Sequence, residues 1–165
     1  MEEVYKMKIS TKGRYALRVL ADLAEHGQNK NVSIREIAER QDISDKYLEG
    51  IVARLSNAGY VKSTRGKYGG YRLTRAPKDY TVYDVLAVSE DSVALVACLE
   101  GEENTCPRKG KCLTLPLWQH MQEQFKEYMK TITLQDILDK RFDVHDDVLG
   151  NDEVEDLPAT HKKAK

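Results

Sequence analysis

The fold is decided by residues 33–74, which read SIREIAERQDISDKYLEGIVARLSNAGYVKSTRGKYGGYRLT. The stretch opens on a capping box, because the Ser33 and Glu36 side chains can satisfy free backbone amides at a helix start reciprocally. A tight turn follows at Asp42-Ile43, and Ser44 can cap the next helix. Two helices joined by a turn of about three to four residues predict a helix-turn-helix. Their buried stripes are expected at Ile34, Ile37 and Ala38, and at Leu48, Ile51, Val52 and Leu55.

Two β-prone runs follow the second helix, at Tyr60–Arg65 and Tyr71–Thr74. The connection between them contains Gly66, Gly69 and Gly70, which permit the positive φ angles of a tight hairpin. Both arms carry Arg or Lys. A helix-turn-helix followed by a basic hairpin predicts a winged helix, and the order of these elements makes the prediction specific.

The flanking sequence predicts further helices from their ends. Ser10 or Thr11 can cap a first helix that Gly27 ends, and its apolar positions Ala16, Leu17, Leu20, Leu23 and Ala24 share one face. Two short helices are expected in the second half, from Thr81 to about Val88 and from Thr133 to near Lys140. The first is opened by a capping box of Thr81 and Asp84, and the second starts at Thr133-Leu134-Gln135-Asp136.

A longer helix is expected from Thr114, with Pro116 tolerated in its first turn. Its large apolar residues follow the alternating three- and four-residue spacing of a heptad seam. One small domain has little interior left for such a stripe, so we expect it to pair with a second copy of the chain; the alternative is packing within one chain. The predicted homodimer seam comprises Trp118, Met121, Phe125, Tyr128 and Ile132.

The predicted fold is therefore mainly α with a small β-hairpin wing. Residues 1–80 are expected to form a winged helix-turn-helix DNA-binding domain. Residues 81–142 are expected to supply a cysteine loop and the long dimerisation helix. In the tail at 143–165, seven acidic residues without a basic one precede three lysines, and this composition predicts disorder.

Composition and charge narrow the classes of function. The 165 residues contain 41% hydrophobic and 32% charged side chains, with no apolar run of the roughly 18 to 20 residues that span a bilayer. The N-terminus lacks the apolar segment of a signal peptide, so we expect a cytoplasmic protein without a membrane partner.

The net charge of −1 conceals two halves of opposite sign. Residues 1–80 hold 16 Lys or Arg against 10 Asp or Glu, whereas residues 81–165 hold 10 against 17. Positive charge is densest between residues 60 and 80, where Asp79 is the single acidic residue. Such a cluster suits a polyanionic partner, and a merely solvated face is the alternative.

The expected partner is double-stranded DNA. In a helix-turn-helix, the N-terminal part of the second helix enters the major groove. There Lys46 can bind a guanine edge or a phosphate, whereas Glu49 can accept from cytosine N4 but repels phosphates. Arg54 lies further along the same helix, and solubility is the alternative role for any of these side chains taken alone. The candidates are Ser10, Thr11 and Lys12, where free amides could hold a phosphate, Ser44, Lys46, Tyr47, Glu49 and Gly50 on the recognition helix, and Arg65 and Lys67 on the wing.

Cys98, Cys106 and Cys112 share one glycine- and charge-rich loop. An odd number of cysteines argues against a disulfide scaffold, and neither a C-x2-C zinc knuckle nor a redox C-x-x-C motif is present. Three thiolates on a loop suit an iron–sulfur cluster, whose negative charge Arg108, Lys109 and Lys111 would partly offset. The alternative from the spacing alone is three unrelated free cysteines.

Four sequence features together resemble the family of winged-helix regulators that includes the iron–sulfur cluster regulator IscR, the nitric-oxide sensor NsrR and the cysteine-metabolism regulator CymR. They are Lys8-Ile9-Ser10-Thr11-Lys12-Gly13-Arg14-Tyr15-Ala16-Leu17, Ser44-x2-Tyr47-Leu48-Glu49, Arg65-Gly66-x2-Gly69-Gly70-Tyr71, and the cysteine loop ending in Cys112-Leu113-Thr114-x2-Leu117-Trp118. The likeness covers roughly residues 7–140. It implies a homodimeric repressor on pseudo-palindromic operators, chiefly of cluster-assembly genes. It also implies that the cysteines bind a [2Fe–2S] cluster whose state selects the promoters.

The family resemblance leaves the fourth ligand of the cluster open. Leu115 stands where some relatives place a histidine, and Arg14 stands where NsrR-type proteins draw a carboxylate from the partner subunit. His120 lies too far along the helix. A backbone group, water or a small thiol could complete the site, and an incomplete set predicts a labile cluster suited to a sensor.

Two other functions and one exclusion complete the expectations. The first alternative is a nitric-oxide or redox responder with a [4Fe–4S] cluster, and the second is a zinc-stabilised DNA-binding dimer. An enzyme is not expected, because the four histidines neighbour no evident nucleophile and no phosphate loop or paired-carboxylate motif is present.

Overall fold

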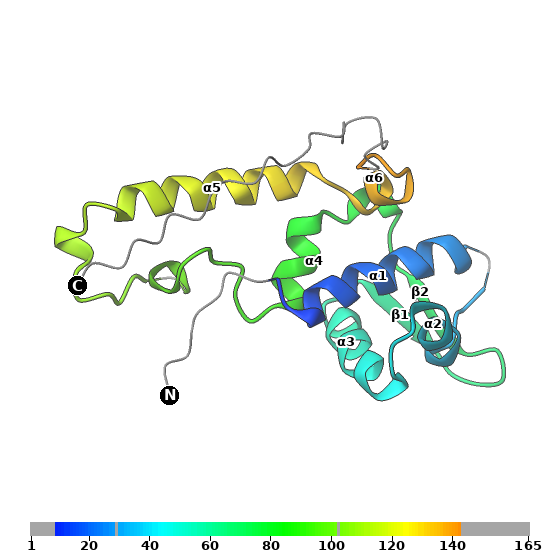
Figure 1. The fold of residues 1–165 in the computed structure, drawn as a ribbon. Helices are drawn as coiled ribbons and strands as arrows, with labels where there is room; N and C mark the ends of the chain where they lie inside the picture. Colours follow the sequence, from blue (N-terminus) through cyan, green and yellow to red (C-terminus); the bar gives the residue numbers. More distant parts are fainter. Residues whose placement is uncertain (1–8, 29, 102, 143–165) are drawn as a thin grey trace, which may run out of the picture.

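The structure, a computed structural model, describes residues 9–28, 30–101 and 103–142. Three helices and a hairpin form its first half, and helices dominate the second (Figure 1). The helices are α1 (Thr11–His26), α2 (Ile34–Gln41), α3 (Asp45–Asn57), α4 (Val82–Ser89), α5 (Leu115–Thr131) and α6 (Leu134–Leu138). The strands are β1 (Val61–Thr64) and β2 (Gly70–Leu73), and short 3-10 turns lie at η1 (Pro77–Asp79), η2 (Ala97–Leu99) and η3 (Lys109–Lys111).

The helix-turn-helix is confirmed, and its ends follow the local sequence. The predicted capping box of α2 is present: Ser33 Oγ accepts from Glu36 N, and Ser33 N donates to the Glu36 carboxylate over 2.8 Å. Asp42 ends the helix in the left-handed conformation, with φ of 52°. Ser44 occupies the cap position of α3, but its side chain makes no capping hydrogen bond.

The wing is confirmed as an antiparallel hairpin in which Val61 pairs with Leu73 and Thr64 with Gly70. Each strand lies within a residue or so of its predicted bounds. Gly70 has φ of 144°, and a Cβ there would lie 2.5 Å from the Val32 carbonyl oxygen. This close approach lets Val32 and Tyr71 exchange two backbone hydrogen bonds of 2.9 and 2.8 Å, so the loop before α2 is joined to the wing.

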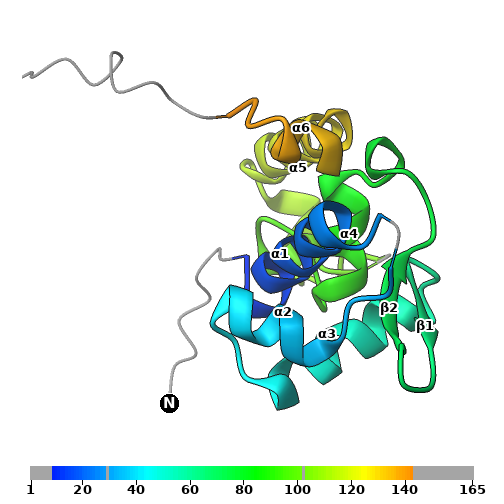
Figure 2. The same cartoon turned by 90° about the vertical axis from the view of Figure 1, so that its right-hand side faces the viewer.

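The hydrophobic core is built around α1, which packs against α2 and α3 on one side and against α4 and α6 on the other (Figure 2). Tyr80, which the sequence analysis did not single out, fixes the base of the wing. Its hydroxyl donates to the Tyr60 carbonyl over 2.8 Å and accepts from the amides of Thr74 and Arg75, both over 3.0 Å. Fully buried core side chains include Val19, Leu20, Leu23, Val32, Ile37, Leu48, Val52, Leu55, Val85 and Leu134.

The second half of the chain leaves the winged helix and returns to it. The chain runs outward from α4 and comes back along α5 (Figure 1). At the return point, Val82 N donates to the Ile132 carbonyl over 2.8 Å and Leu134 N donates to the Tyr80 carbonyl over 2.9 Å. Helix α6 then packs on α1. The C-terminal end of α5 is therefore anchored to the domain that carries the wing.

Three local details of this half differ from the sequence-based expectation. Helix α5 ends at Thr131, so Ile132 is an extended C-cap residue and not a helical member of the seam. Thr114 stands at the start of α5 without a capping side-chain bond. Thr81 accepts from Asp84 N, but among the described residues the reciprocal half of that capping box is absent.

The predicted disordered tail, residues 143–165, lies outside the described residues. Within the described ranges, no helix is both long enough and apolar enough to cross a membrane.

Candidate nucleic-acid interface and cysteine segment

Helix α3 buries one face and exposes the other. Leu48, Ile51, Val52 and Leu55 enter the core. On the outer face, Lys46, Glu49 and Gly50 are exposed. Tyr47 is 38% exposed, and its ring meets Tyr15 of α1 edge-on, with centroids 5.7 Å apart and an interplanar angle of 88°. This contact orients the Tyr47 ring, whereas the exposed Lys46, Glu49 and Gly50 are accessible to a partner.

The start of α1 lies next to this outer face. Ser10 caps the helix, and its hydroxyl accepts from Lys12 N over 3.0 Å. The Lys12 amide is therefore used by the helix cap. A cavity of about 290 Å³, here called the α1–α3 cavity, separates the two helices. It is lined by Lys12, Lys46, Tyr47, Gly50, Ile51, Arg54 and Ser89.

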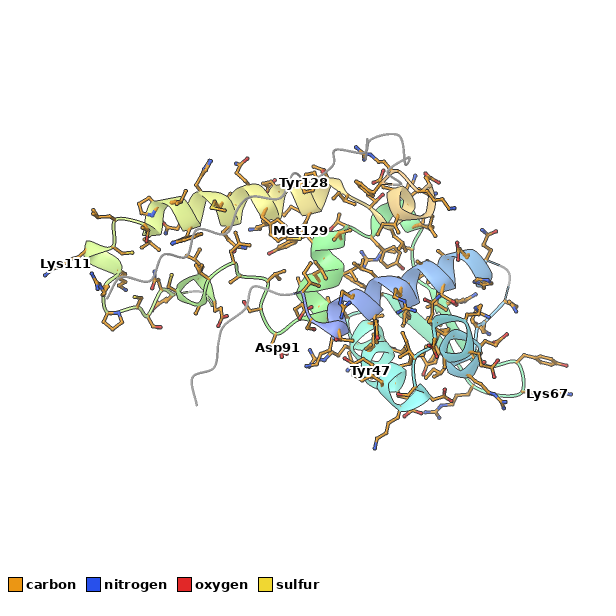
Figure 3. The ribbon with its side chains drawn as sticks, in the orientation of Figure 1. Tyr47, Lys67, Asp91, Lys111, Tyr128 and Met129 are labelled. Atoms are coloured by element: carbon orange, nitrogen blue, oxygen red, sulfur yellow. The ribbon has the colours of Figure 1, made fainter. Side chains whose placement is uncertain are left out.

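The wing presents a further cationic surface. Arg65 and Lys67 are both exposed at its turn, and the Lys67 ammonium lies 5.7 Å from the ring centroid of Tyr68, which is 82% exposed. Asn31 steadies the turn, because its side-chain amide donates to the Tyr68 carbonyl over 3.1 Å. Figure 3 places Tyr47 and Lys67 on the side of the molecule away from α5.

The structure thus brings the α1 start and the recognition helix around one cavity, with the wing turn on the same side of the molecule. Sequence reasoning missed Tyr68, although an aromatic residue between glycines on a basic turn is a recognisable signal. It also missed Glu90 and Asp91, whose side chains contact the α1 start from the end of α4.

The cysteine segment, residues 98–112, lies beside α5 and reaches the tip of the outward arm, where Figure 3 labels Lys111. Cys98, Cys106 and Cys112 are free and half-buried. They do not converge: among the described residues, no group of three or more His, Cys, Asp or Glu side chains is placed to hold a metal ion. Gathering the three thiols would require the segment to change conformation.

The chemistry of the cysteine segment nevertheless fits a thiolate-bound centre. The Cys106 amide donates to Asn104 Oδ1 over 2.9 Å, whereas the buried Asn104 Nδ2 has no hydrogen-bond partner among the described residues. Such an orphan donor is costly unless a ligand satisfies it. Hydrogen bonds from Thr114, first from its hydroxyl 3.4 Å away and then from its backbone, lower the pKa of Cys112. Arg108, Lys109 and Lys111 are exposed in the same segment, and the charge of Arg108 also lowers the pKa of Cys112.

Among the described residues, helix α5 keeps large apolar side chains exposed on one face. Its one buried residue is Met129, which points toward α4, whereas Tyr128 lies on the other side (Figure 3). Leu117, Met121 and Tyr128 are 53%, 44% and 58% exposed. Trp118, Phe125 and Ile132, the other members of the predicted seam, are half-buried. Leu117 belongs to the same face by its spacing, although the seam prediction omitted it.

The chain between α4 and the cysteine segment is fastened to this helix by one side chain. Gln122 accepts from Leu95 N over 2.7 Å and donates to the Val93 carbonyl over 3.3 Å. The two polar groups of its amide are both used. Gln122 thus links the chain just before the cysteine segment to α5.

Comparison with known proteins gives one consistent result. The family profile Rrf2, described as an iron-dependent transcriptional regulator, matches residues 9–140. Protein rrf2 of Nitratidesulfovibrio vulgaris is 42% identical over 132 residues, which cover 80% of this chain and 87% of that protein.

Two solved structures share the fold. That of CymR, the global cysteine regulator of B. subtilis, has a TM-score of 0.64 and 38% identity, and the match covers 80% of this chain and 96% of CymR. That of T. potens IscR has a TM-score of 0.64 and 36% identity, with 84% of this chain and 92% of the other covered.

Proposed function

Because the chain belongs to the Rrf2 family of transcriptional regulators, we propose that it is a cytoplasmic, homodimeric repressor that binds pseudo-palindromic DNA and is switched by an iron–sulfur cluster. The DNA-binding and regulatory role is that of the family, and its named relatives are regulators, not enzymes. The dimer, the cluster and the target genes, chiefly those for cluster assembly, are the proposal.

For DNA binding, α3 is assigned to the major groove and the wing to the neighbouring backbone or minor groove. Lys46 would contact a guanine edge or a phosphate, and Glu49 would select cytosine while repelling phosphates. Arg65 and Lys67 would add contacts that carry little sequence information. The exposure of these side chains, with the α3 residues on the outer face and the wing on the side away from α5, supports the assignment.

The regulatory centre is assigned to Cys98, Cys106 and Cys112. A [2Fe–2S] cluster held by these thiolates would supply a redox- and iron-dependent signal. The Asn104 side-chain amide has a free donor beside Cys106 that could satisfy a sulfur atom. Arg108, Lys109 and Lys111 would offset negative charge, and Gln122 would pass a change of the segment to α5.

One observation carries the proposal: three free thiols share a short segment, and the chain just before that segment is fastened by Gln122 to the helix with the exposed apolar face. Any conformational change that gathers the thiols therefore reaches α5, along which we place the dimer contact. A ligand acts as a switch only if it binds the two states differently, and the need to gather the thiols supplies that difference.

The test begins with protein purified without oxygen, examined by absorption, EPR, and iron, sulfide and zinc analysis. A [2Fe–2S] signature supports the proposal, and a [4Fe–4S] signature instead favours a nitric-oxide or redox responder. One zinc per chain without sulfide makes the cysteines a structural site. Colourless, iron-free protein that resists reconstitution overturns the cluster assignment.

A second measurement separates DNA binding from the switch. Binding to a cluster-assembly promoter is compared for wild type and Cys106→Ala, each before and after reconstitution with ferrous iron and sulfide. We expect reconstitution to change the affinity or sequence preference of wild type alone. Equal binding under all four conditions would leave a DNA-binding protein without a cluster switch.

A further inference from the structure

The last turn of α4 inserts an acidic side chain against the start of α1. Glu90 Oε1 accepts from Ser10 N over 2.8 Å. Gly13 makes room for it: a Cβ at that position would lie 2.2 Å from the same carboxylate oxygen. An anion is favoured at this end of a helix, where free amides concentrate positive charge. Glu90 thus holds residues 90 and 91 against the face that contains the α1–α3 cavity.

The next residue places a second carboxylate against the cations of this cavity. Asp91 lies 3.6 Å from the Lys12 ammonium and 3.3 Å from the Arg54 guanidinium. Arg54 also donates to the Ser89 carbonyl over 3.3 Å, which turns its side chain toward the end of α4. One anion therefore bridges a cation of α1 and a cation of α3.

These contacts are of a kind that another anion can replace. The Asp91 side chain is 79% exposed, and those of Lys12 and Arg54 are 43% and 44% exposed. Ion pairs this open to water contribute little free energy. The hydrogen bond from Arg54 and the charge of Lys12 lower the pKa of Asp91, so its carboxylate is ionised at neutral pH.

We propose that Lys12 and Arg54 form a subsite for a DNA backbone phosphate, and that Asp91 occupies this subsite when DNA is absent. Asp91 is then an internal competitor for DNA. The inference rests on the proposed DNA-binding function and adds a means of regulating it. Since only residues 92–97 connect Asp91 to Cys98, a conformational change of the cysteine segment can displace this competitor.

The test uses Asp91→Asn, which keeps the shape of the side chain and removes its charge. The probe is a fluorescently labelled duplex of arbitrary sequence, titrated from about 50 to about 200 mM salt, because phosphate contacts are read from the salt dependence. We expect the variant to bind about three- to tenfold more tightly at the lower salt concentration. The slope of the logarithm of its association constant for DNA against the logarithm of the salt concentration should be steeper by about 0.9 for each of Lys12 and Arg54 that becomes free to bind a phosphate.

Two further variants sharpen the result. Asp139→Asn makes the same change of net charge at an exposed residue of the α6 end and should bind like wild type. The double variant Asp91→Asn with Arg54→Gln should lose most of the gain, because one of the two released cations is missing. A gain that survives in the double variant, or an equal gain from Asp139→Asn, would assign the effect to overall charge and overturn the subsite.

Failure of this proposal is distinct from failure of the proposed function. If wild type binds the duplex and Asp91→Asn matches it in affinity and salt dependence, the competitor role is overturned while DNA binding stands. If folded wild type binds no duplex under any condition, the proposed function is overturned as well.

Discussion

The Asp22 carboxylate in α1 holds the Arg40 guanidinium of α2 through two hydrogen bonds of 2.9 and 2.7 Å. The Asp22 side chain has no exposed surface, whereas that of Arg40 is 30% exposed. Gln41 donates a third hydrogen bond to the same carboxylate over 2.9 Å. The orientation of α2 on α1, and with it the helix-turn-helix, depends on this buried charge.

Replacing Asp22 by Asn should destabilise the fold by about 3 kcal/mol at neutral pH, because it leaves Arg40 without its buried partner. Burial raises the pKa of Asp22, but the hydrogen bonds from Arg40 and Gln41 outweigh it and lower the pKa overall. Because the pKa of Asp22 is lower in the folded protein than the value of about 3.9 in the unfolded chain, the ionised carboxylate stabilises the fold at any pH above about 3.9. This stabilisation is lost as the pH falls through the pKa of the folded protein. Urea unfolding should therefore show the variant and wild type converging below about pH 4, and a constant difference would contradict the assignment.

Two glycine substitutions should have opposite effects on stability. Ala at Gly13 places its Cβ 2.2 Å from Glu90 Oε1 and 2.9 Å from a Leu86 methyl group, and such overpacking costs about 1–3 kcal/mol. Ala at Gly50 meets nothing within 4 Å and should stabilise α3 by about 1 kcal/mol. Urea unfolding of both variants measures whether the free energy of unfolding falls for Gly13→Ala and rises for Gly50→Ala. If Gly50→Ala also weakens DNA binding, the α3 backbone approaches DNA closely at this point.

Lys67 and Glu49 should affect DNA binding in different ways. Lys67→Ala should weaken binding about equally on all sequences and flatten the plot of log K against log salt by about 0.9. Glu49→Ala should not weaken binding to arbitrary DNA, because it removes a carboxylate that repels phosphates, and it should relax discrimination at one or two base pairs, each worth about 1–3 kcal/mol. Titration of an operator and its single-base variants measures both. Equal effects from the two substitutions would mean that the groove assignment is wrong.

Cys112 should react more slowly with iodoacetamide when Thr114 is replaced by Val. The Thr114 hydroxyl lowers the pKa of Cys112, and the thiolate is the reactive form. Without that hydroxyl, the alkylation rate near neutral pH should fall severalfold and approach the wild-type rate at high pH, where both thiols are ionised. Mass spectrometry follows the reaction at each cysteine, and Cys106 is the internal reference. A rate difference that persists at high pH would indicate altered access instead.

Tyr128→Glu should weaken the proposed dimer by at least about tenfold in Kd, or 1.4 kcal/mol, because a charge would be placed in an apolar contact. Gln119→Glu adds the same charge on the opposite face of α5 and should leave the dimer intact. Sedimentation velocity over a concentration series measures both. If both variants sediment like wild type, the dimer contact lies elsewhere.

The sequence was sufficient for the winged helix because its signals are local. The Ser33–Glu36 capping box and the glycines of the hairpin each determine a backbone conformation within a few residues. The periodic stripe of α3, from Leu48 to Leu55, similarly selected its buried face. No contact from a distant part of the chain was needed to recognise these elements.

The parts that the sequence did not reveal depend on contacts across long separations. Glu90 reaches Ser10 across 80 positions, and no local pattern marks either residue. Helix α5 ends before Ile132, next to the bridge between Thr81 and Thr133. A heptad pattern describes only local spacing, so it cannot indicate this helix end. The cysteines could be recognised as a set, but their separation in space follows from the path of the segment along α5.

The bridge between Thr81 and Thr133 has a consequence for the length of the operator. It ties the C-terminal end of α5 to Tyr80, and Tyr80 is hydrogen-bonded to the base of the wing, so hydrogen bonds connect α5 to the wing. If the proposed dimer forms along α5, we expect the spacing between its two recognition helices to be fixed. Such a dimer binds only when both half-sites face the same side of the double helix. Inserting about five base pairs between them turns one half-site to the opposite side and should abolish binding by the dimer.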